Sequence, residues 1–188
     1  PLLLRKSGIR HPGIGRASFF QLNTNVIGLM RETVNGHLGI EQGIVSRQFE
    51  RDGLVYEAVS TPVALTVPYM PGFGVAQFEQ LRAFPRMAQQ GVIIDADKTP
   101  LTVRGLLGAP LITFDLHDDD AARIRDGMTT CVRILEAAGA ERFLVPGAEQ
   151  WHGTAKDALA DIQAMHQADL HLASVHPIGT WPMGNDPT

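Results

Sequence analysis

The sequence predicts an α+β fold in which a largely antiparallel sheet of about six strands is covered by helices. Short segments that are rich in β-branched residues, or that alternate between polar and apolar residues, follow one another through the first 116 positions. The clearest helical periodicities come after these segments, in the C-terminal part of the chain. Because strands and helices do not alternate strictly, a doubly wound nucleotide-binding fold is not expected.

Six segments have the composition of strands. The segment 43–49 shows the cleanest alternation. Pro62 interrupts the segment 54–66, because proline cannot donate a backbone hydrogen bond to a sheet. The six expected strands are residues 23–30, 43–49, 54–66, 92–95, 101–104 and 111–116.

The strongest helical pattern covers residues 118–139. Three aspartates at residues 118–120 put negative charge at the N-terminal end, where the helix dipole is positive. Gly139 provides a C-terminal cap. Between these ends, apolar residues recur at spacings of three and four, and these residues are Ile124, Met128, Cys131, Val132 and Leu135.

Two further helices are predicted. Thr154 and Asp157 have the spacing of a capping box, so a helix is expected to begin at Thr154. Residues 75–90 are helical in character, and Pro85 is expected to bend or end that helix. The inward-facing residues of the helix after Thr154 are expected to be Leu159, Ile162 and Met165.

Length and composition limit the class of protein. The 188 residues are enough for one domain with a real core, and the net charge of −4 does not suit a nucleic-acid-binding surface. No apolar run reaches the roughly 20 residues of a membrane span. The single cysteine, Cys131, excludes an internal disulfide and a cysteine-based zinc site. No signal peptide is visible, which leaves the compartment open and slightly favours the cytoplasm, and the first residue, Pro1, suggests a piece of a longer protein.

Several patterns that can indicate chemistry are incomplete. G-x-G occurs at residues 13–15 and 72–74, but neither has the third glycine of a dinucleotide fingerprint. His166, His171 and His176 recur every five residues, whereas two metal-binding histidines on one helical face need a spacing of three or four. No G-x-S-x-G elbow of a serine hydrolase is present. Phosphate binding, metal binding and serine hydrolysis are therefore not expected.

The segment around position 70 contains several large apolar residues. They could line a pocket or belong to the core, and the core is favoured because aromatic and methionine side chains are mostly buried. These residues are Tyr69, Met70, Phe73 and Phe78.

His176 is the strongest candidate for a catalytic group. It precedes Pro177 in a stretch that also contains Pro182, and such a stretch is not expected to form a helix or a regular strand. A histidine held by a rigid loop is a good general acid or base, because imidazoles titrate near neutrality. From residue chemistry alone, a structural histidine that bonds a carbonyl is the favoured interpretation.

Both ends of the chain resemble the glucose–methanol–choline (GMC) oxidoreductases, a family of flavoenzymes that oxidise alcohols. Residues 176–187 read H-P-I-G-T-W-P-M-G-N-D-P, similar to the family motif H-P-x-G-T-C-R-M-G-x-D-P, with Trp181-Pro182 in place of Cys-Arg. Residues 1–9 read P-L-L-L-R-K-S-G-I, similar to the second family signature, S-P-x-L-L-x-x-S-G-I. Residues 11–16 resemble the link that leads out of the flavin domain.

The resemblance implies a domain organisation. Residues 1–16 would be the trailing edge of an FAD-binding domain. Residues 17–170 would be the substrate-binding domain, with the α+β fold of the C-terminal domain of FAD-linked reductases. Residues 171–188 would be a return segment that carries the His-Pro motif.

The resemblance also implies an activity for the parent protein, an FAD-dependent alcohol oxidase or dehydrogenase. His176 would lie before the flavin and remove the hydroxyl proton of a small-molecule alcohol, while a hydride passes to the flavin. A second catalytic His or Asn would lie beyond residue 188. Because these 188 residues encode no complete flavin site, the chain alone is expected to be inactive and to bind FAD weakly. Its partner would be the FAD-binding domain, and the surface that faces that domain could make the chain self-associate.

A second hypothesis is a non-catalytic binding or interaction module that keeps the fold, and the Trp181-Pro182 departure favours it. The parent gene distinguishes the two hypotheses. An upstream G-x-G-x-x-G strand–turn–helix and a downstream His or Asn would support the enzyme, and their absence would support the module.

Overall fold

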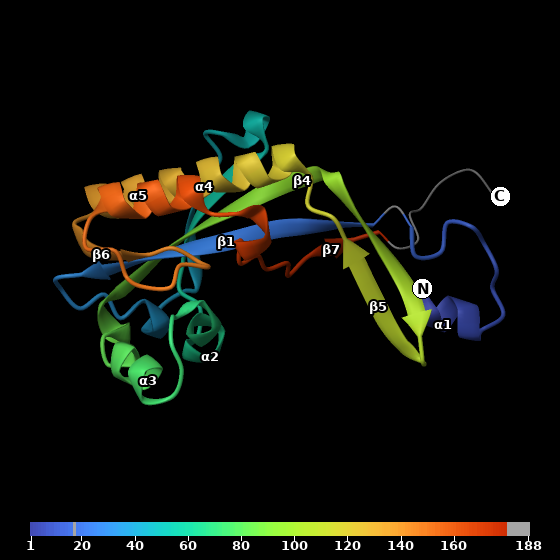
Figure 1. Cartoon of the computed structure of the whole chain (residues 1–188), viewed down its shortest axis with the longest axis horizontal. Helices are drawn as coiled ribbons and strands as arrows, with labels where there is room; N and C mark the ends of the chain where they lie inside the picture. The colour runs from blue at the N-terminus through green and yellow to red at the C-terminus, as the bar shows by residue number, and fades with distance from the viewer. Residues whose placement is uncertain (17, 180–188) are drawn as a thin grey trace.

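A computed structural model describes residues 1–16 and 18–179 of the chain and confirms the predicted α+β class (Figure 1). One open sheet of seven strands, with all neighbours antiparallel, carries two long helices on one face. The strands are β1 (Ser18–Met30), β2 (Gln42–Ser46), β3 (Leu54–Val59), β4 (Met87–Leu106), β5 (Ala109–Phe114), β6 (Ala140–Leu144) and β7 (Pro177–Ile178). The helices are α1 (Leu2–Lys6), α2 (Val63–Thr66), α3 (Val75–Leu81), α4 (Asp118–Ala137) and α5 (Ala155–Ala164). Short 3₁₀ turns are Gly36–Leu38, Glu50–Asp52, Val67–Tyr69, Phe84–Arg86 and Gln167–Asp169.

The two long strands β1 and β4 form the centre of the sheet. The main strand order is β2-β3-β4-β1-β6. Strand β5 pairs with the C-terminal part of β4, on the same edge of β4 as β3. Strand β7 pairs with the N-terminal part of β1, on the same edge of β1 as β6. The first strand and the last strand of the chain therefore lie side by side.

The pairing of β1 with β4 contains one large irregularity. Phe19 pairs with Pro100, but Gln21 pairs with Asp95, so residues 96–99 of β4 are inserted opposite a single residue of β1. The sequence predicted two separate strands, 92–95 and 101–104, and this prediction was wrong. The charged run before Pro100 resembles a turn, yet the chain stays extended through it.

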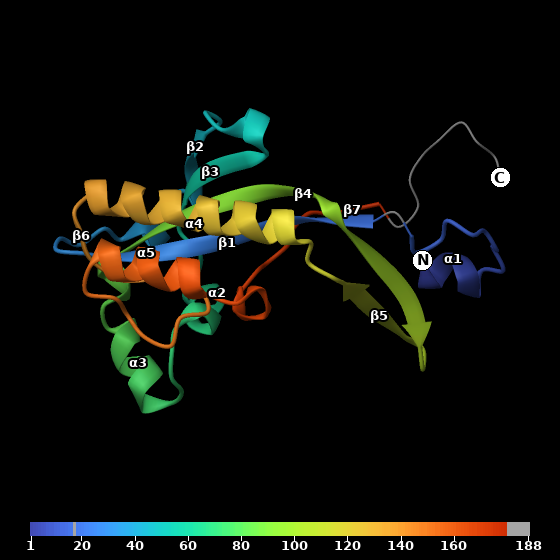
Figure 2. The ribbon, with the colours of Figure 1, turned by 45° about the horizontal axis from the view of Figure 1, so that its top comes forward.

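Helices α4 and α5 cover one face of the sheet and lie side by side (Figure 2). The five apolar residues predicted to face inward from α4 are all buried, and so are Ile162 and Met165. They pack against even-numbered residues of β1 and β4, including Leu22, Val26 and Val92. The main core therefore lies between these two helices and the sheet.

The ends of both helices confirm the predicted capping signals. The backbone N–H of Asp157 donates to Thr154 Oγ1, at the start of α5. Gly139 follows α4 with a φ of 92°, which is the left-handed conformation that glycine adopts readily. The N-cap of α4 is His117, whose Nδ1 accepts from the N–H of Asp119. The sequence had indicated only the aspartates that follow it.

The opposite face of the sheet carries α2, α3 and a small core. This core consists of Ile27, Met70, Phe84, Met87 and Leu144. Two predictions for this part of the chain were wrong. Residues 63–66 form α2, because β3 already ends at Val59 and Pro62 occupies the N-cap position of the helix. The predicted helix 75–90 ends at Leu81, since Pro85 cannot continue it, and Met87 already pairs with Leu29 of β1.

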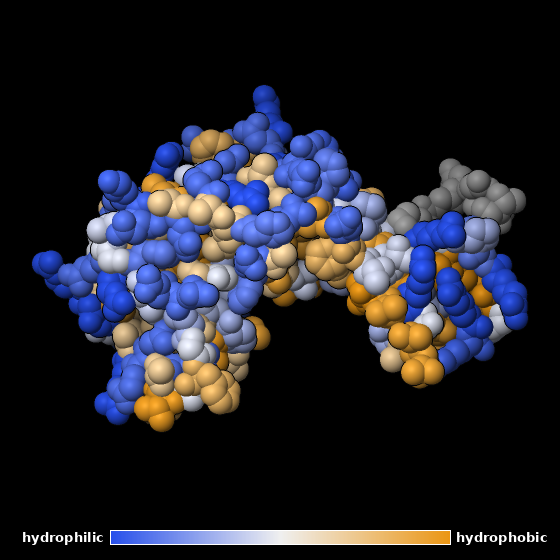
Figure 3. Space-filling model, viewed as in Figure 1, coloured by the Kyte–Doolittle hydropathy of each residue, from blue (hydrophilic) through white to orange (hydrophobic). Residues whose placement is uncertain are grey.

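Strands β4 and β5 form a hairpin that extends beyond the rest of the sheet, with α1 beside it (Figure 1). Apolar side chains gather on this part of the surface (Figure 3). Leu107, at the tip, is 99% exposed, and Ile112 and Phe114 are about half exposed. The other large apolar residues exposed on the hairpin are Leu106 and Leu111.

Part of the His-Pro motif, residues 176–187, lies outside the described residues. The structure describes His176, Pro177, Ile178 and Gly179, whereas residues 180–187, with Trp181 and Pro182, fall outside it. Pro177 and Ile178 form the short strand β7, although an irregular loop was expected there. Within the described ranges, no helix has both the length and the apolar character needed to cross a bilayer.

Candidate functional site

Two β-bridges fix the position of His176 on the sheet. Asn23 bridges Ala173 before the histidine, and Phe20 pairs with Pro177 after it. Pro177 also restricts the backbone of the residue that precedes it to extended conformations. The pairing of Phe20 with Pro177 places His176 directly opposite Gln21 of β1. His176 Nδ1 lies 2.6 Å from Gln21 Oε1, and the ring is exposed at the surface.

His176 lies at the edge of a cavity of about 710 Å³ on the face of the sheet opposite α4 and α5. The floor comes from β1, β3 and β4, one wall from residues 60–69, and the other wall from residues 170–176. The lining residues are Asn23, Asn25, Glu41, Gln42, Glu57, Val59, Ser60, Thr61, Pro62, Leu65, Pro68, Tyr69, Gly91, Val92, Ile93, Leu170, His171, Leu172, Ala173, Val175 and His176.

The floor of the cavity is polar because alternate residues of three strands point the same way. Asn25, Gly91 and Glu57 form one row across β1, β4 and β3, and Asn23 and Ile93 belong to the next row. The Asn23, Asn25 and Glu57 side chains are partly buried, yet none has a hydrogen-bond partner among the described residues. Partly buried polar groups without partners are typical of a surface that binds a ligand or ordered water.

Gly91 makes room for the Asn25 amide. A Cβ atom at position 91 would lie 2.7 Å from Asn25 Oδ1, which is too close for two non-bonded atoms. A glycine inside a strand often marks a place where another group approaches the backbone closely. The floor is therefore shaped around the side chain of Asn25.

A buried hydroxyl and amide network holds the wall at residues 60–69. Thr61 Oγ1 donates to Gln89 Oε1 over 2.7 Å, and Gln89 Nε2 donates to Thr66 Oγ1 over 3.2 Å. Tyr69 lies in the same wall, and burial raises the pKa of its phenol. Because Gln89 belongs to β4, this network joins the wall to the floor.

The Asp, Glu, Lys and Arg residues that line the cavity are all acidic. Glu41 and Glu57 supply carboxylates, and the described lining contains no lysine or arginine. Amide and hydroxyl groups supply the remaining polar atoms. Such a lining suits neutral or cationic molecules and disfavours those that carry a carboxylate or phosphate.

A smaller cavity of about 400 Å³ lies next to the first, and Gln21 belongs to its lining. Gln21 and Ile93 line it together with Phe19, Asp95 and Ile178. Ile93 lines both cavities, so they are neighbours on the same face of the sheet. The pair formed by Gln21 and His176 stands between them.

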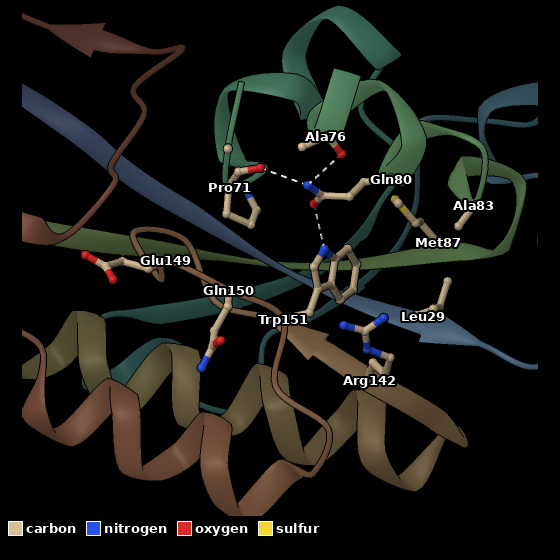
Figure 4. Close-up of a pocket in the computed structure, with 11 residues that line it drawn as sticks. Leu29, Pro71, Ala76, Gln80, Ala83, Met87, Arg142, Glu149, Gln150 and Trp151 are labelled. Atoms are coloured by element: carbon tan, nitrogen blue, oxygen red, sulfur yellow. Dashed lines mark hydrogen bonds between the residues drawn. The ribbon is translucent and has the colours of Figure 1, made fainter. Parts of the chain in front are cut away.

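A third cavity, of about 440 Å³, lies near α3 and β6 and does not include His176 (Figure 4). The polar groups at its centre bond to one another. Trp151 Nε1 donates to Gln80 Oε1 over 2.9 Å, and Gln80 Nε2 donates to the carbonyl of Pro71 over 2.8 Å. The Arg142 guanidinium lies 5.6 Å from the centre of the Trp151 ring. These contacts join α3 to β6, and the cavity is not the candidate site.

The remaining sequence patterns do not form sites in the structure. Residues 13–15 form a turn whose backbone bonds Val103, and residues 72–74 precede α3, which is seven residues long. In the described part of the chain, no group of three or more His, Cys, Asp or Glu side chains is arranged to hold a metal ion. Burial raises the pKa of the Cys131 thiol, which lies inside the main core.

Two predictions about individual residues were wrong. Phe73 is 92% exposed and Phe78 is 64% exposed, so neither belongs to the core, whereas Met70 is buried as expected. The cavity floor was missed altogether. A signal was present, since Gln21, Asn23 and Asn25 alternate with buried residues along one strand, which is the pattern of a polar strand face.

Comparison with known proteins identifies relatives of the chain. The family model described as GMC oxidoreductase matches residues 102–188. Two uncharacterized GMC-type oxidoreductases of Mycobacterium tuberculosis, from strains CDC 1551 and H37Rv, are each 32% identical to the chain over 191 residues. These alignments cover 99% of this chain and 30% of each relative, so the chain spans about a third of their length. No solved structure shows significant similarity.

Proposed function

This chain belongs to the GMC oxidoreductase family, and on that premise we propose that it is the substrate-binding part of an FAD-dependent alcohol oxidoreductase. In this proposal residues 17–170 form the substrate-binding domain, and residues 171–188 are the return segment that carries the His-Pro motif. The observation that carries the proposal is the 710 Å³ cavity, whose polar floor lies beside His176.

In this proposal His176 acts as the general base. The alcohol lies in the cavity with its reacting hydroxyl toward the imidazole, which takes the hydroxyl proton. A hydride then leaves the alcohol carbon, and the product is an aldehyde or a ketone. The flavin, when bound, supplies the hydride acceptor.

The flavin would be held by a companion FAD-binding domain. A dinucleotide site needs a glycine-rich turn between a strand and the N-terminus of a helix. The described residues contain no such unit, because residues 13–15 lead to no helix and residues 72–74 follow no strand. The exposed apolar hairpin formed by β4 and β5 is the surface that we assign to contact with that domain, and it would favour self-association of the isolated chain.

The isolated 188-residue chain is expected to retain no FAD on gel filtration, because residues 1–16 and 18–179 form no pyrophosphate site. The measurement is flavin absorbance in the protein peak after incubation with excess FAD. Elution of about one flavin per chain would contradict this expectation. Far-UV circular dichroism of the same sample confirms that the chain is folded during the test.

The cavity floor favours an alcohol that carries further hydroxyl groups and no carboxylate. In the enzyme assembled with its FAD-binding domain, Asn25→Ala and Glu57→Gln are each expected to raise KM for such an alcohol about tenfold, the equivalent of one lost hydrogen bond. Gly91→Ala should also raise KM for this alcohol, because the added Cβ atom displaces the Asn25 amide.

Steady-state kinetics on matched alcohols with and without the extra hydroxyls would check this prediction. Glu149→Gln, in the cavity near Trp151, is the control and should leave KM unchanged. A KM within about twofold of the parent enzyme for all three floor variants would contradict a role of the floor in binding.

A further inference from the structure

The contact between His176 and Gln21 determines more than the position of the ring. His176 Nδ1 lies 2.6 Å from Gln21 Oε1, which is hydrogen-bonding distance. An amide oxygen can only accept a hydrogen bond, so Nδ1 must be the donor. A neutral imidazole carries one N–H, and with that proton on Nδ1 the lone pair lies on Nε2.

The backbone around this pair is built to hold it. His176 immediately precedes β7, and the pairing of Pro177 with Phe20 puts it opposite Gln21 of β1, at the distance where cross-strand side chains interact. The large register irregularity between β1 and β4 falls between Phe19 and Gln21. Irregularities of this kind change the direction of nearby side chains and occur often beside active sites.

We propose that Gln21 is a positioning residue that fixes His176 as the Nδ1–H tautomer and so leaves Nε2 as the atom that accepts the substrate proton. The proposal rests on the proposed function of His176 as general base. It goes further, since it names the reactive nitrogen and the residue that selects it. Gln21 acts through His176 and has no contact with the reacting atoms in this proposal.

Nitrogen NMR of the imidazole rings tests the tautomer directly, without any turnover. Long-range ¹H–¹⁵N correlation spectra of the 188-residue chain, at a pH where the ring is neutral, distinguish a protonated nitrogen from one with a lone pair. His176→Ala identifies the signals of this ring among the seven histidines. The expected result is a protonated Nδ1 and an unprotonated Nε2. A protonated Nε2 would overturn the proposal.

Two variants at position 21 separate positioning from a merely structural role. Gln21→Leu has a similar size but no acceptor, so His176 should populate both tautomers, and kcat of the assembled enzyme should fall at least about tenfold with little change in KM. Gln21→Glu keeps an acceptor oxygen, so it should retain the Nδ1–H tautomer and most of the turnover. Equal losses of kcat in both variants, with the tautomer unchanged in both, would contradict the proposal.

The outcomes distinguish this inference from the proposed function. If Nδ1 carries the proton but His176→Ala leaves turnover unchanged, then His176 is not the base and only the tautomer assignment stands. If His176→Ala abolishes turnover but Nε2 carries the proton, then the base is correct and the role of Gln21 is wrong. Where a variant at position 21 fails to fold, the spectrum of the unmodified chain, assigned with His176→Ala, still gives the tautomer.

Discussion

Replacing His176 with alanine is expected to lower kcat of the assembled oxidoreductase by roughly 10²–10⁴-fold, which is the usual contribution of a general base. The side chain stands at the edge of the polar cavity, between two β-bridges that leave its backbone little freedom. The variant removes the proton acceptor and should leave the cavity floor intact. The loss should therefore appear in kcat, and in the rate of flavin reduction under anaerobic single-turnover conditions, rather than in KM.

Two other histidines provide matched controls. His171 lines the same cavity, but its hydrogen bond is made by the backbone, whose carbonyl accepts from Thr24 Oγ1, so His171→Ala should have a small effect. His166 is exposed and lies outside the cavity, and His166→Ala should have none. A change of less than about threefold in His176→Ala, or a larger loss in His171→Ala, would argue against His176 as the base.

Replacing Asp120 with alanine is expected to lower the free energy of unfolding by about 2–4 kcal/mol, the sum of a charged hydrogen bond and a favourable charge at a helix N-terminus. Asp120 is fully buried in the first turn of α4. Thr99 Oγ1 donates to its Oδ2 over 2.5 Å, and Arg123 Nη2 lies 3.1 Å from its Oδ1 as an ion pair. Without the carboxylate, the buried hydroxyl of Thr99 loses its acceptor.

Urea unfolding followed by circular dichroism would measure this change. Asp120→Asn keeps an acceptor oxygen, so its free energy of unfolding should fall by less, about 1 kcal/mol. Asp118→Ala is the matched control, because Asp118 is exposed in the same turn. A loss in Asp120→Ala no larger than in Asp118→Ala would show that the buried contacts contribute nothing measurable.

The contacts of Asp120 also support the irregular part of the sheet. Thr99 belongs to the four residues of β4 that are inserted opposite β1, and Arg123 donates to the carbonyl of Asp95 at the start of this insertion. Arg123 also pairs with Asp97 and lowers the pKa of that carboxyl. The N-terminal part of α4 therefore holds the inserted residues and Asp95, which pairs with Gln21, so the stability of this part of α4 and the position of the candidate base are linked through β4.

Local sequence signals predicted the two long helices, α4 and α5, well. The periodicity of α4 depends only on residues within the helix, and the buried positions of Met128, Cys131 and Leu135 follow from it. Thr154 and Asp157 are three residues apart, so their capping contact could also be read directly. These features need no information about distant parts of the chain.

The site could be predicted only in part, because it depends on the register between strands. His176 was identified from its motif, but Gln21 is 155 residues away in the sequence. Asn25, Gly91 and Glu57 form one row only because β1, β4 and β3 pair with a particular register. Likewise, residues 92–95 and 101–104 were predicted as separate strands, because the contacts that support the residues between them come from α4.

The pairing of β7 with β1 has a consequence for how the chain folds. Contacts between residues so far apart in sequence carry a large entropy of loop closure, and they form late unless other contacts bring the two segments together first. Strand β7 has two residues, both exposed, so it contributes little to the core that α4, α5 and the central strands create. Cleavage just before His176 should therefore remove the candidate base while leaving a folded, cooperative domain, and an assay of fold alone would not detect the loss.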